Sequence, residues 1–268
     1  MPFPGPQVPS RFRRMVNPAL QAAADLIYPR LCCVCKVPLA LDAPREGSRA
    51  WFCKVCEEEL PLVEPPYCMV CGEVYDGSFT NEFRCMNCDG RRLQFEFAVA
   101  ACRAEGAIRE LVHQFKYERR LQLRGPLATL MLRTFAEPRL ADENLADWLL
   151  VPVPLHRSRE QDREFNQSWE LCVRLSSLTG IRAVNALARV RETETQASLD
   201  RDERLKNLRG AFALRKTWSW EEKLVLEGRR ILLVDDVFTT GATTSECARV
   251  LRTEGRAEKV VVITVARG

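Results

Sequence analysis

Apolar residues recur with two different periods along this chain, and the change from one period to the other marks the predicted elements. After residue 93, short apolar runs of strand length alternate with longer segments in which apolar residues recur at helical spacing. The predicted strands are 95–102, 148–153, 231–234 and 259–266, and the predicted helices are 106–117, 126–136, 166–178 and 243–254. Strands that alternate with helices predict an α/β fold, with a mostly parallel sheet flanked by helices.

The residues before this region have a different character. The first of them are rich in proline and arginine and are predicted to be loose. Asn17 and Pro18 suit the N-cap and first turn of a short amphipathic helix, which Pro29 ends. The predicted organisation is a loose segment, a helix, a cysteine-rich module and an α/β domain, at 1–16, 17–30, 31–92 and 93–268 respectively.

Eight of the twelve cysteines form four Cys-x-x-Cys pairs, which are Cys32/Cys35, Cys53/Cys56, Cys68/Cys71 and Cys85/Cys88. A two-residue spacer lets both sulfur atoms of a tight turn point at one metal ion, and two such turns complete a tetrahedral four-thiolate zinc site. Disulfides require an oxidising compartment, and we expect no export signal because polar residues interrupt the apolar segment near the N-terminus. One redox pair does not explain four repeats. We therefore predict a double zinc ribbon with two structural Zn²⁺ ions.

The favoured pairing of these turns is sequential. One site then consists of Cys32, Cys35, Cys53 and Cys56, and the other of Cys68, Cys71, Cys85 and Cys88. The alternative is a crossed arrangement, in which the first pair joins the third. Three other cysteines lie in apolar patterns and are interpreted as small core residues, namely Cys102, Cys172 and Cys247.

The overall balance is that of a soluble globular protein, with 46% hydrophobic and 28% charged residues. No apolar stretch is long enough to span a bilayer, and we expect a cytoplasmic protein. The formal charge of +4 falls to about zero if eight cysteines bind two zinc ions as thiolates. The charge is therefore a weak indication of nucleic-acid binding. Basic clusters at 11–14, 91–92 and 119–120 are candidates for it, although each is also typical of a solvated face.

The segment from Ile231 to Thr244 carries the clearest chemistry. Asp235 and Asp236 follow a short apolar strand, and ligands of open α/β sheets bind at the carboxyl ends of strands. A loop of threonines and Gly241 then leads into a helix, whose N-terminus offers unpaired N–H groups to an anion. These residues predict a phosphate site beside two acids for hydroxyls or a metal ion. The alternative is an ordinary turn and helix cap.

Two further segments are candidates for ligand contacts. Arg159 and Arg163 follow the strand at 148–153, where they could bind pyrophosphate oxygens in a bidentate manner. A solvated loop with internal ion pairs explains the same residues equally well. The polar stretch that begins at Thr195 and Gln196 could close over a charged substrate as a lid, or it is merely a mobile connection.

At this point the sequence resembles a known family of enzymes. Val234-Asp-Asp-Val-x-Thr-Thr-Gly-Ala-Thr243 is similar to the phosphoribosyl pyrophosphate motif of type I phosphoribosyltransferases. The resemblance implies that Asp235 and Asp236 hold the ribose hydroxyls. It also implies that the loop holds the 5′-phosphate, through Thr239, Thr240, Gly241, Ala242 and Thr243.

The order of the motifs along the chain makes the resemblance more specific. The cysteine pairs precede Phe115-Lys116-Tyr117, Val-Pro-Val-Pro-Leu155, Arg159-x3-Arg163-x-Phe-Asn-Gln167 and the acidic motif. Over about residues 17–268 this order is similar to the ComF competence-protein family, which couples a zinc ribbon to a phosphoribosyltransferase-like domain. One position departs from the family pattern, because Glu164 stands where the family usually has glycine. Glutamate there adds bulk and a negative charge near the predicted anion site.

The resemblance implies two alternative functions. In the first, an enzyme binds phosphoribosyl pyrophosphate with Mg²⁺ and transfers the ribose phosphate to an unknown acceptor, in DNA uptake or nucleotide metabolism. Asp235, Asp236, Arg159 and Arg163 would be catalytic, and Lys116 would help bind the substrate. In the second, a non-catalytic zinc-ribbon protein binds single-stranded DNA or a helicase partner in natural transformation.

Overall fold

The computed structural model describes residues 25, 28–40, 42–75, 77, 83–141, 143–155, 163–191, 208–215 and 225–268. The predicted segment 1–16, most of the predicted helix within 17–30, Arg159 and the predicted lid from Thr195 to residue 207 lie outside these residues.

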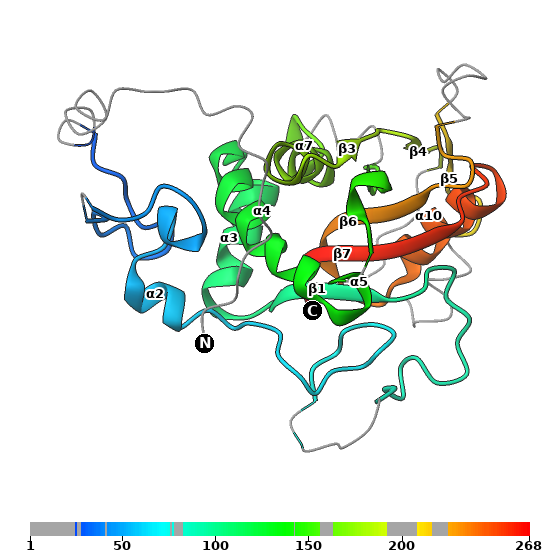
Figure 1. The fold of residues 1–268 in the computed structure, drawn as a ribbon, viewed down its shortest axis with the longest axis horizontal. Helices are drawn as coiled ribbons and strands as arrows, with labels where there is room; N and C mark the ends of the chain where they lie inside the picture. Colours follow the sequence, from blue (N-terminus) through cyan, green and yellow to red (C-terminus); the bar gives the residue numbers. More distant parts are fainter. Residues whose placement is uncertain are drawn as a thin grey trace.

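A five-stranded parallel sheet forms the centre of the molecule (Figure 1). Its strands, in spatial order, are β1 (Ala98–Arg103), β7 (Lys259–Arg267), β6 (Arg230–Phe238), β2 (Leu149–Pro152) and β3 (Arg182–Ala183). Every pairing in this sheet is parallel. The predicted α/β class is therefore confirmed, and each of the four predicted strands has a counterpart within a few residues of its expected bounds.

The structure also contains elements that the apolar pattern does not predict. A separate antiparallel pair consists of β4 (Leu187–Arg189) and β5 (Phe212–Leu214). Both strands have only three residues, so neither contains enough positions to establish a period of two. The short helices outside the sheet are η1 (Ser48–Ala50), α2 (Lys54–Glu58), η2 (Leu121–Leu123), α5 (Pro138–Ala141) and η4 (Leu145–Asp147).

The long helices lie between the strands along the chain, and in one of them the residues at the two ends explain where it begins and ends. These long helices are α3 (Gly106–Tyr117), α4 (Arg124–Met131), which continues as η3 (Leu132–Ala136), α7 (Gln167–Thr179) and α10 (Ala242–Thr253). Asn166 caps α7, because its side chain accepts hydrogen bonds from the amides of Ser168 and Trp169. Gly180 ends the helix in the left-handed conformation at φ 77°. Within the part of the chain that the structure describes, no helix combines the length and apolarity that crossing a membrane requires.

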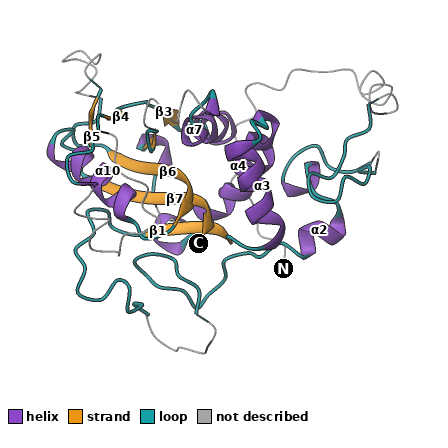
Figure 2. Ribbon diagram, turned by 180° about the vertical axis from the view of Figure 1, so that it is seen from behind, coloured by secondary structure: helices purple, strands orange, loops and turns teal. Residues whose placement is uncertain are grey.

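Successive residues of the sheet pack into two different cores. Leu232 and Val234 of β6 belong to the core shared with α3, α4 and α7. Ile231 and Leu233, the intervening residues, belong to the core shared with α10. Figure 2 shows α3, α4 and α7 grouped together, apart from α10. Because both faces are covered, the strands are mostly apolar at consecutive positions. Burying one large apolar side chain completely stabilises the folded state by about 1.5–3 kcal/mol.

Candidate functional site

The two acids of the 231–244 segment lie within a strand and not after it. The prediction ended this strand at residue 234, whereas β6 pairs with β7 as far as Phe238, opposite Arg267. The neighbour on the other side, β2, ends earlier, at Pro152 opposite Val234, and the amide of Val153 donates one further bond to the carbonyl of Val234 at 2.9 Å. Asp235 and Asp236 therefore lie beyond the carboxyl end of β2 while β7 still supports them.

Asp236 forms an ion pair with a lysine from α3. The Nζ atom of Lys116 lies 2.7 Å from Oδ1 of Asp236, and both side chains are largely buried. Burial disfavours the charge on Lys116, but the carboxylates of Asp236 and Asp235 outweigh it and raise the pKa of the lysine. The pair thus places a lysine against one of the two acids at the end of the sheet.

Asp235 is held by α7, whereas Asp236 is held by α3. Ser168 Oγ donates a hydrogen bond of 3.0 Å to Asp235 Oδ1, which also accepts one from the amide of Asp236. Asn166, besides capping α7, donates from Nδ2 to the carbonyl of Val153 at 3.1 Å and so ties the helix to the end of β2. Burial and the negative charge of Asp236 raise the pKa of Asp235 to about 7. The two adjacent acids therefore have different partners, a lysine for Asp236 and a serine hydroxyl for Asp235.

The loop after β6 brings backbone amides to the same end of the sheet. Gly241 adopts φ 74°, and a Cβ atom there would lie 2.7 Å from the ring of Phe238, so a side chain is excluded on two grounds. Ala242 begins α10, whose first amides have no intrahelical partner. Thr244 Oγ1 donates to the carbonyl of Gly241, and Thr239 is exposed. The predicted loop thus brings the first amides of α10 and several threonine hydroxyls to the end of the strand that carries the acids, with the amide of Ala242 donating to Thr240 Oγ1 at 3.5 Å.

Arg163 lies beside the Lys116–Asp236 pair. Its guanidinium group stacks on the ring of Tyr117, 4.9 Å from the ring centre, and donates to Gln167 Oε1 at 3.1 Å. Glu164 adopts φ 67°, the conformation for which the family glycine is suited. Its exposed carboxylate pairs with Arg119, which also has a positive φ of 55°. The negative charge that we expected near the anion site is therefore balanced by a neighbouring cation.

The other basic clusters are also engaged within the protein. Arg120 pairs with Glu118 at 3.2 Å, next to the Arg119–Glu164 pair. Arg91 turns inward, as described below, and only Arg92 of that cluster is exposed. The cluster at 11–14 lies outside the described residues. Arg119 and Arg120 thus pair with acids of this chain and Arg92 is exposed, while nucleic-acid binding by these clusters stays a prediction.

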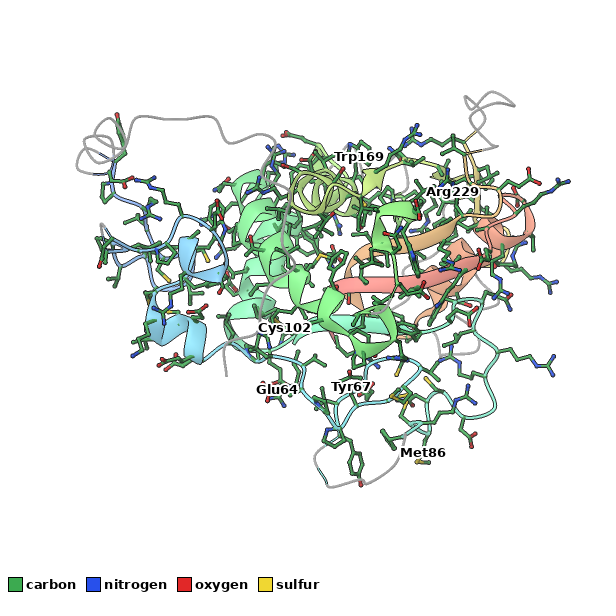
Figure 3. All side chains as sticks on the ribbon, in the orientation of Figure 1. Glu64, Tyr67, Met86, Cys102, Trp169 and Arg229 are labelled. Atoms are coloured by element: carbon green, nitrogen blue, oxygen red, sulfur yellow. The ribbon has the colours of Figure 1, made fainter. Side chains whose placement is uncertain are left out.

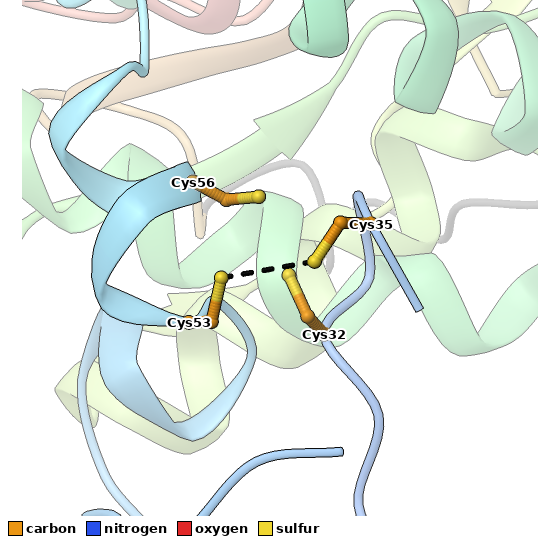
Figure 4. Close-up of side chains that lie close together, drawn as sticks. All are labelled: Cys32, Cys35, Cys53 and Cys56. Carbon is orange, nitrogen blue, oxygen red and sulfur yellow. Dashed lines mark hydrogen bonds between the residues drawn. The ribbon is translucent and has the colours of Figure 1, made fainter. Parts of the chain in front are cut away.

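The eight paired cysteines form two four-sulfur clusters with the sequential pairing. In each cluster all sulfur atoms lie within 4.8 Å of one another, and the clusters are Cys32, Cys35, Cys53, Cys56 and Cys68, Cys71, Cys85, Cys88. Figure 4 shows the first, in which the sulfurs of Cys35 and Cys53 are 3.7 Å apart. A tetrahedron with Zn–S bonds of about 2.3 Å has sulfurs about 3.8 Å apart, so both clusters fit structural zinc ions. The crossed pairing is not formed.

The two clusters have different surroundings. The first packs with Leu39 in a small core of its own. The second belongs to the same core as α10 and one face of the sheet, and Tyr67 beside it donates to Glu137 Oε2 at 2.7 Å. Figure 3 shows Tyr67 on the side of α5 and Met86 at the outer edge of the second cluster. The three remaining cysteines predicted for the core are fully buried, and burial raises the pKa of Cys102 to about 12.

Two arginines connect the second cluster to the loop after β6, and neither was predicted to do so. Arg91 Nη1 donates to the carbonyls of Asn87 and Thr240, at 3.3 and 3.2 Å. Arg267 Nη1 donates to the carbonyl of Phe238 at 3.2 Å, while Nη2 pairs with Glu73 and lies 3.9 Å from Cys71 Sγ. A charged residue at the end of the otherwise apolar β7 was the available sequence signal for Arg267.

Of the predicted site residues, the structure thus brings together the two acids, Lys116, Arg163 and the 239–243 loop. It adds Ser168 and Asn166. Arg159 lies outside the described residues.

The fold and these side chains define an α/β protein with an acidic site at the end of its sheet and two four-cysteine clusters. No protein-family model matches the chain. DNA utilization protein YhgH of Escherichia coli K12 is 31% identical over 234 residues, covering 87% of this chain and 95% of that protein. Competence protein F of Haemophilus influenzae is 29% identical over 81% of this chain and 90% of its own length. Competence protein ComFC of Bacillus subtilis is 25% identical over 90% and 96%.

This chain therefore belongs to the ComF family of competence and DNA utilization proteins. Among solved structures, the allosteric regulatory enzyme of purine biosynthesis is similar over 57% of this chain and 30% of its own, with 17% identity and a TM-score of 0.36. A TM-score this low carries no argument about function.

Proposed function

We propose that this protein binds phosphoribosyl pyrophosphate, or a related ribose 5-phosphate, at the end of β6 and transfers the ribose phosphate to an acceptor. The observation that carries the proposal is the continuity of Asp235, Asp236, the Gly241 loop and the start of α10 along one stretch of chain. The acids would accept hydrogen bonds from the ribose hydroxyls, and the amides and hydroxyls of residues 239–243 would bind the 5′-phosphate.

The chemistry of the transfer needs charge stabilisation more than proton transfer. Mg²⁺, bound with the substrate, would neutralise pyrophosphate oxygens, and carboxylates such as Asp235 and Asp236 are the ligands it prefers. Arg163, whose guanidinium group stacks on Tyr117, would stabilise the leaving pyrophosphate, with Arg159 as the proposed second cation. Lys116 would hold the Asp236 carboxylate in place through their ion pair. The 239–243 loop holds the substrate in position for attack.

Calorimetric titration with ribose 5-phosphate tests this assignment. We expect the wild-type protein to bind it, and the double variant Asp235→Asn, Asp236→Asn to lose roughly a hundred-fold or more in affinity, because two charge-assisted hydrogen bonds are lost. Glu110→Gln, an exposed acid on α3, is the matched control and should bind as the wild type does. Unchanged binding by the double variant would contradict the site.

The names of the relatives motivate a second role, in handling DNA. We expect binding of a single strand to be weak and to fall steeply between about 50 and 200 mM salt, because it would depend on phosphate contacts by lysine and arginine. Filter binding or anisotropy across this range measures it. Tight binding that does not depend on salt concentration would exclude binding through phosphate contacts by lysine and arginine. An absence of binding at the lowest salt concentration would show that single-stranded DNA is not a direct ligand.

A further inference from the structure

The loop that we assign to phosphate binding is held through its carbonyl groups. Arg91 donates to the carbonyl of Thr240, and Arg267 donates to the carbonyl of Phe238. A second bond to Phe238 comes from the amide of Gly268, at 2.9 Å. Arg91 therefore contacts the loop and Arg267 the residue just before it, both on the side of the second cysteine cluster and both through carbonyl groups.

Because the peptide group is planar, these contacts to carbonyl groups fix the direction in which the following amides point. In a planar trans peptide the carbonyl and the following N–H point in opposite directions. When Arg91 engages the Thr240 carbonyl, the N–H of Gly241 must point away from Arg91. Arg267 has the same effect on the N–H of Thr239, through the Phe238 carbonyl. Two loop amides are thus directed away from the cysteine cluster, where an anion can meet them.

The second cysteine cluster in turn holds the two arginines. Both guanidinium groups line a small hollow together with Cys71 and Cys88. Arg267 pairs with Glu73, two residues after Cys71, and Arg91 bonds to Asn87, the residue before Cys88. Four thiolates around one Zn²⁺ carry about two net negative charges, which two adjacent arginines would balance. The metal-bound form of the cluster therefore favours these arginine positions.

We propose that Arg91 and Arg267 are positioning residues for the phosphate loop, and that the second cysteine cluster, with its metal ion, sets the affinity of the loop for phosphate. This inference rests on the proposed function for its ligand, but the order of the loop is a property of the ligand-free protein. The first cluster has no such contact with the loop among the described residues, so the two clusters are not equivalent.

A neighbouring pair of arginines provides the matched test. Arg91→Gln and Arg92→Gln remove the same charge from adjacent positions, but only Arg91 contacts the loop and Arg92 is exposed. We expect hydrogen exchange of a peptide covering residues 236–247 in ligand-free Arg91→Gln to be faster than in the wild type. We expect ribose 5-phosphate affinity to fall about ten-fold in this variant, and to stay within about two-fold in Arg92→Gln.

The role of the metal is tested by one cysteine substitution in each cluster. Cys71→Ser and Cys35→Ser should each lower zinc content by one ion, and only Cys71→Ser should speed exchange of the 236–247 peptide. Arg267→Lys keeps the charge but cannot reach Phe238 and Glu73 from two separate nitrogens, so it should also speed exchange of this peptide, with zinc retained.

Equal hydrogen-exchange rates of the 236–247 peptide in Arg91→Gln and Arg92→Gln would overturn the inference. Equal rates in Cys71→Ser and Cys35→Ser would overturn it as well. If the wild type binds no ribose 5-phosphate while Arg91→Gln still loosens the loop, the proposed function fails and the positioning role stands.

Discussion

Replacing Asp235 with asparagine should make the protein more stable while removing its ligand binding. The pKa of Asp235 is raised from its ordinary 3.8 to about 7, so its ionised form is disfavoured in the folded protein. Asparagine keeps an oxygen that can accept from Ser168 and from the amide of Asp236 without placing a charge there. We expect a gain of about 2 kcal/mol in the free energy of unfolding at pH 8, discounted for the partial exposure of the side chain.

The pH dependence distinguishes this explanation from a general packing effect. Between about pH 4 and 7 the folded protein retains a proton on Asp235 that the unfolded chain releases, so this group lowers stability as the pH rises. The advantage of Asp235→Asn should therefore be largest at pH 8, less than half as large at pH 5, and absent below about pH 4. Chemical denaturation followed by circular dichroism measures it.

Asp236→Asn is the internal comparison and should have the opposite sign. It leaves Lys116 largely buried without its partner, for an expected loss of about 2 kcal/mol. If both substitutions shift stability in the same direction, the opposite contributions that we assign to the two acids are wrong.

Loss of the second cysteine cluster should cost far more stability than loss of the first. We expect two zinc ions per chain by elemental analysis, and one after either Cys85→Ser or Cys35→Ser. Cys85→Ser should lower the free energy of unfolding by more than about 4 kcal/mol, because its cluster belongs to the core of the sheet and α10. Cys35→Ser should change the main transition by less than about 1 kcal/mol, because its cluster packs in a separate small core.

Two results would contradict this prediction. One zinc ion per wild-type chain would exclude one of the sites. Equal losses of stability in the two variants would mean that the first cluster contributes to the main core as much as the second. Thermal denaturation with the zinc content of each sample measured in parallel decides between these outcomes.

The sequence predicts well the features that depend on residues close together in the chain. The runs at 231–234 and 260–263 are apolar at consecutive positions because both faces of the sheet are covered, and this predicts buried parallel strands. Asn166 has the side chain that an N-cap needs, and α7 begins directly after it. The cysteine spacing predicts which two cysteines share a turn, because each turn brings two sulfurs together locally, whereas the sequential pairing of the turns was only favoured over the crossed one and is found in the structure.

The features that could not be predicted depend on contacts between distant segments. Ser168 meets Asp235 only because Asn166 ties the start of α7 to the end of β2. The length of β6 is set by its pairing with β7, and not by its own composition, since it includes two acids. Arg91 contacts a carbonyl 149 residues further along the chain, and nothing near it in the sequence indicates that partner.

The strand order also has a consequence for how the protein is made. β6 and β7 occupy the middle of the sheet but follow every other strand in the chain, and β1 pairs with β7 across more than half of the sequence. On a ribosome, both cysteine clusters emerge early and can close around metal through short-range contacts, whereas β1 and β2 must wait for central partners made much later. The second cluster would then be complete before the loop it contacts is synthesised, and the sheet would close onto an existing metal centre.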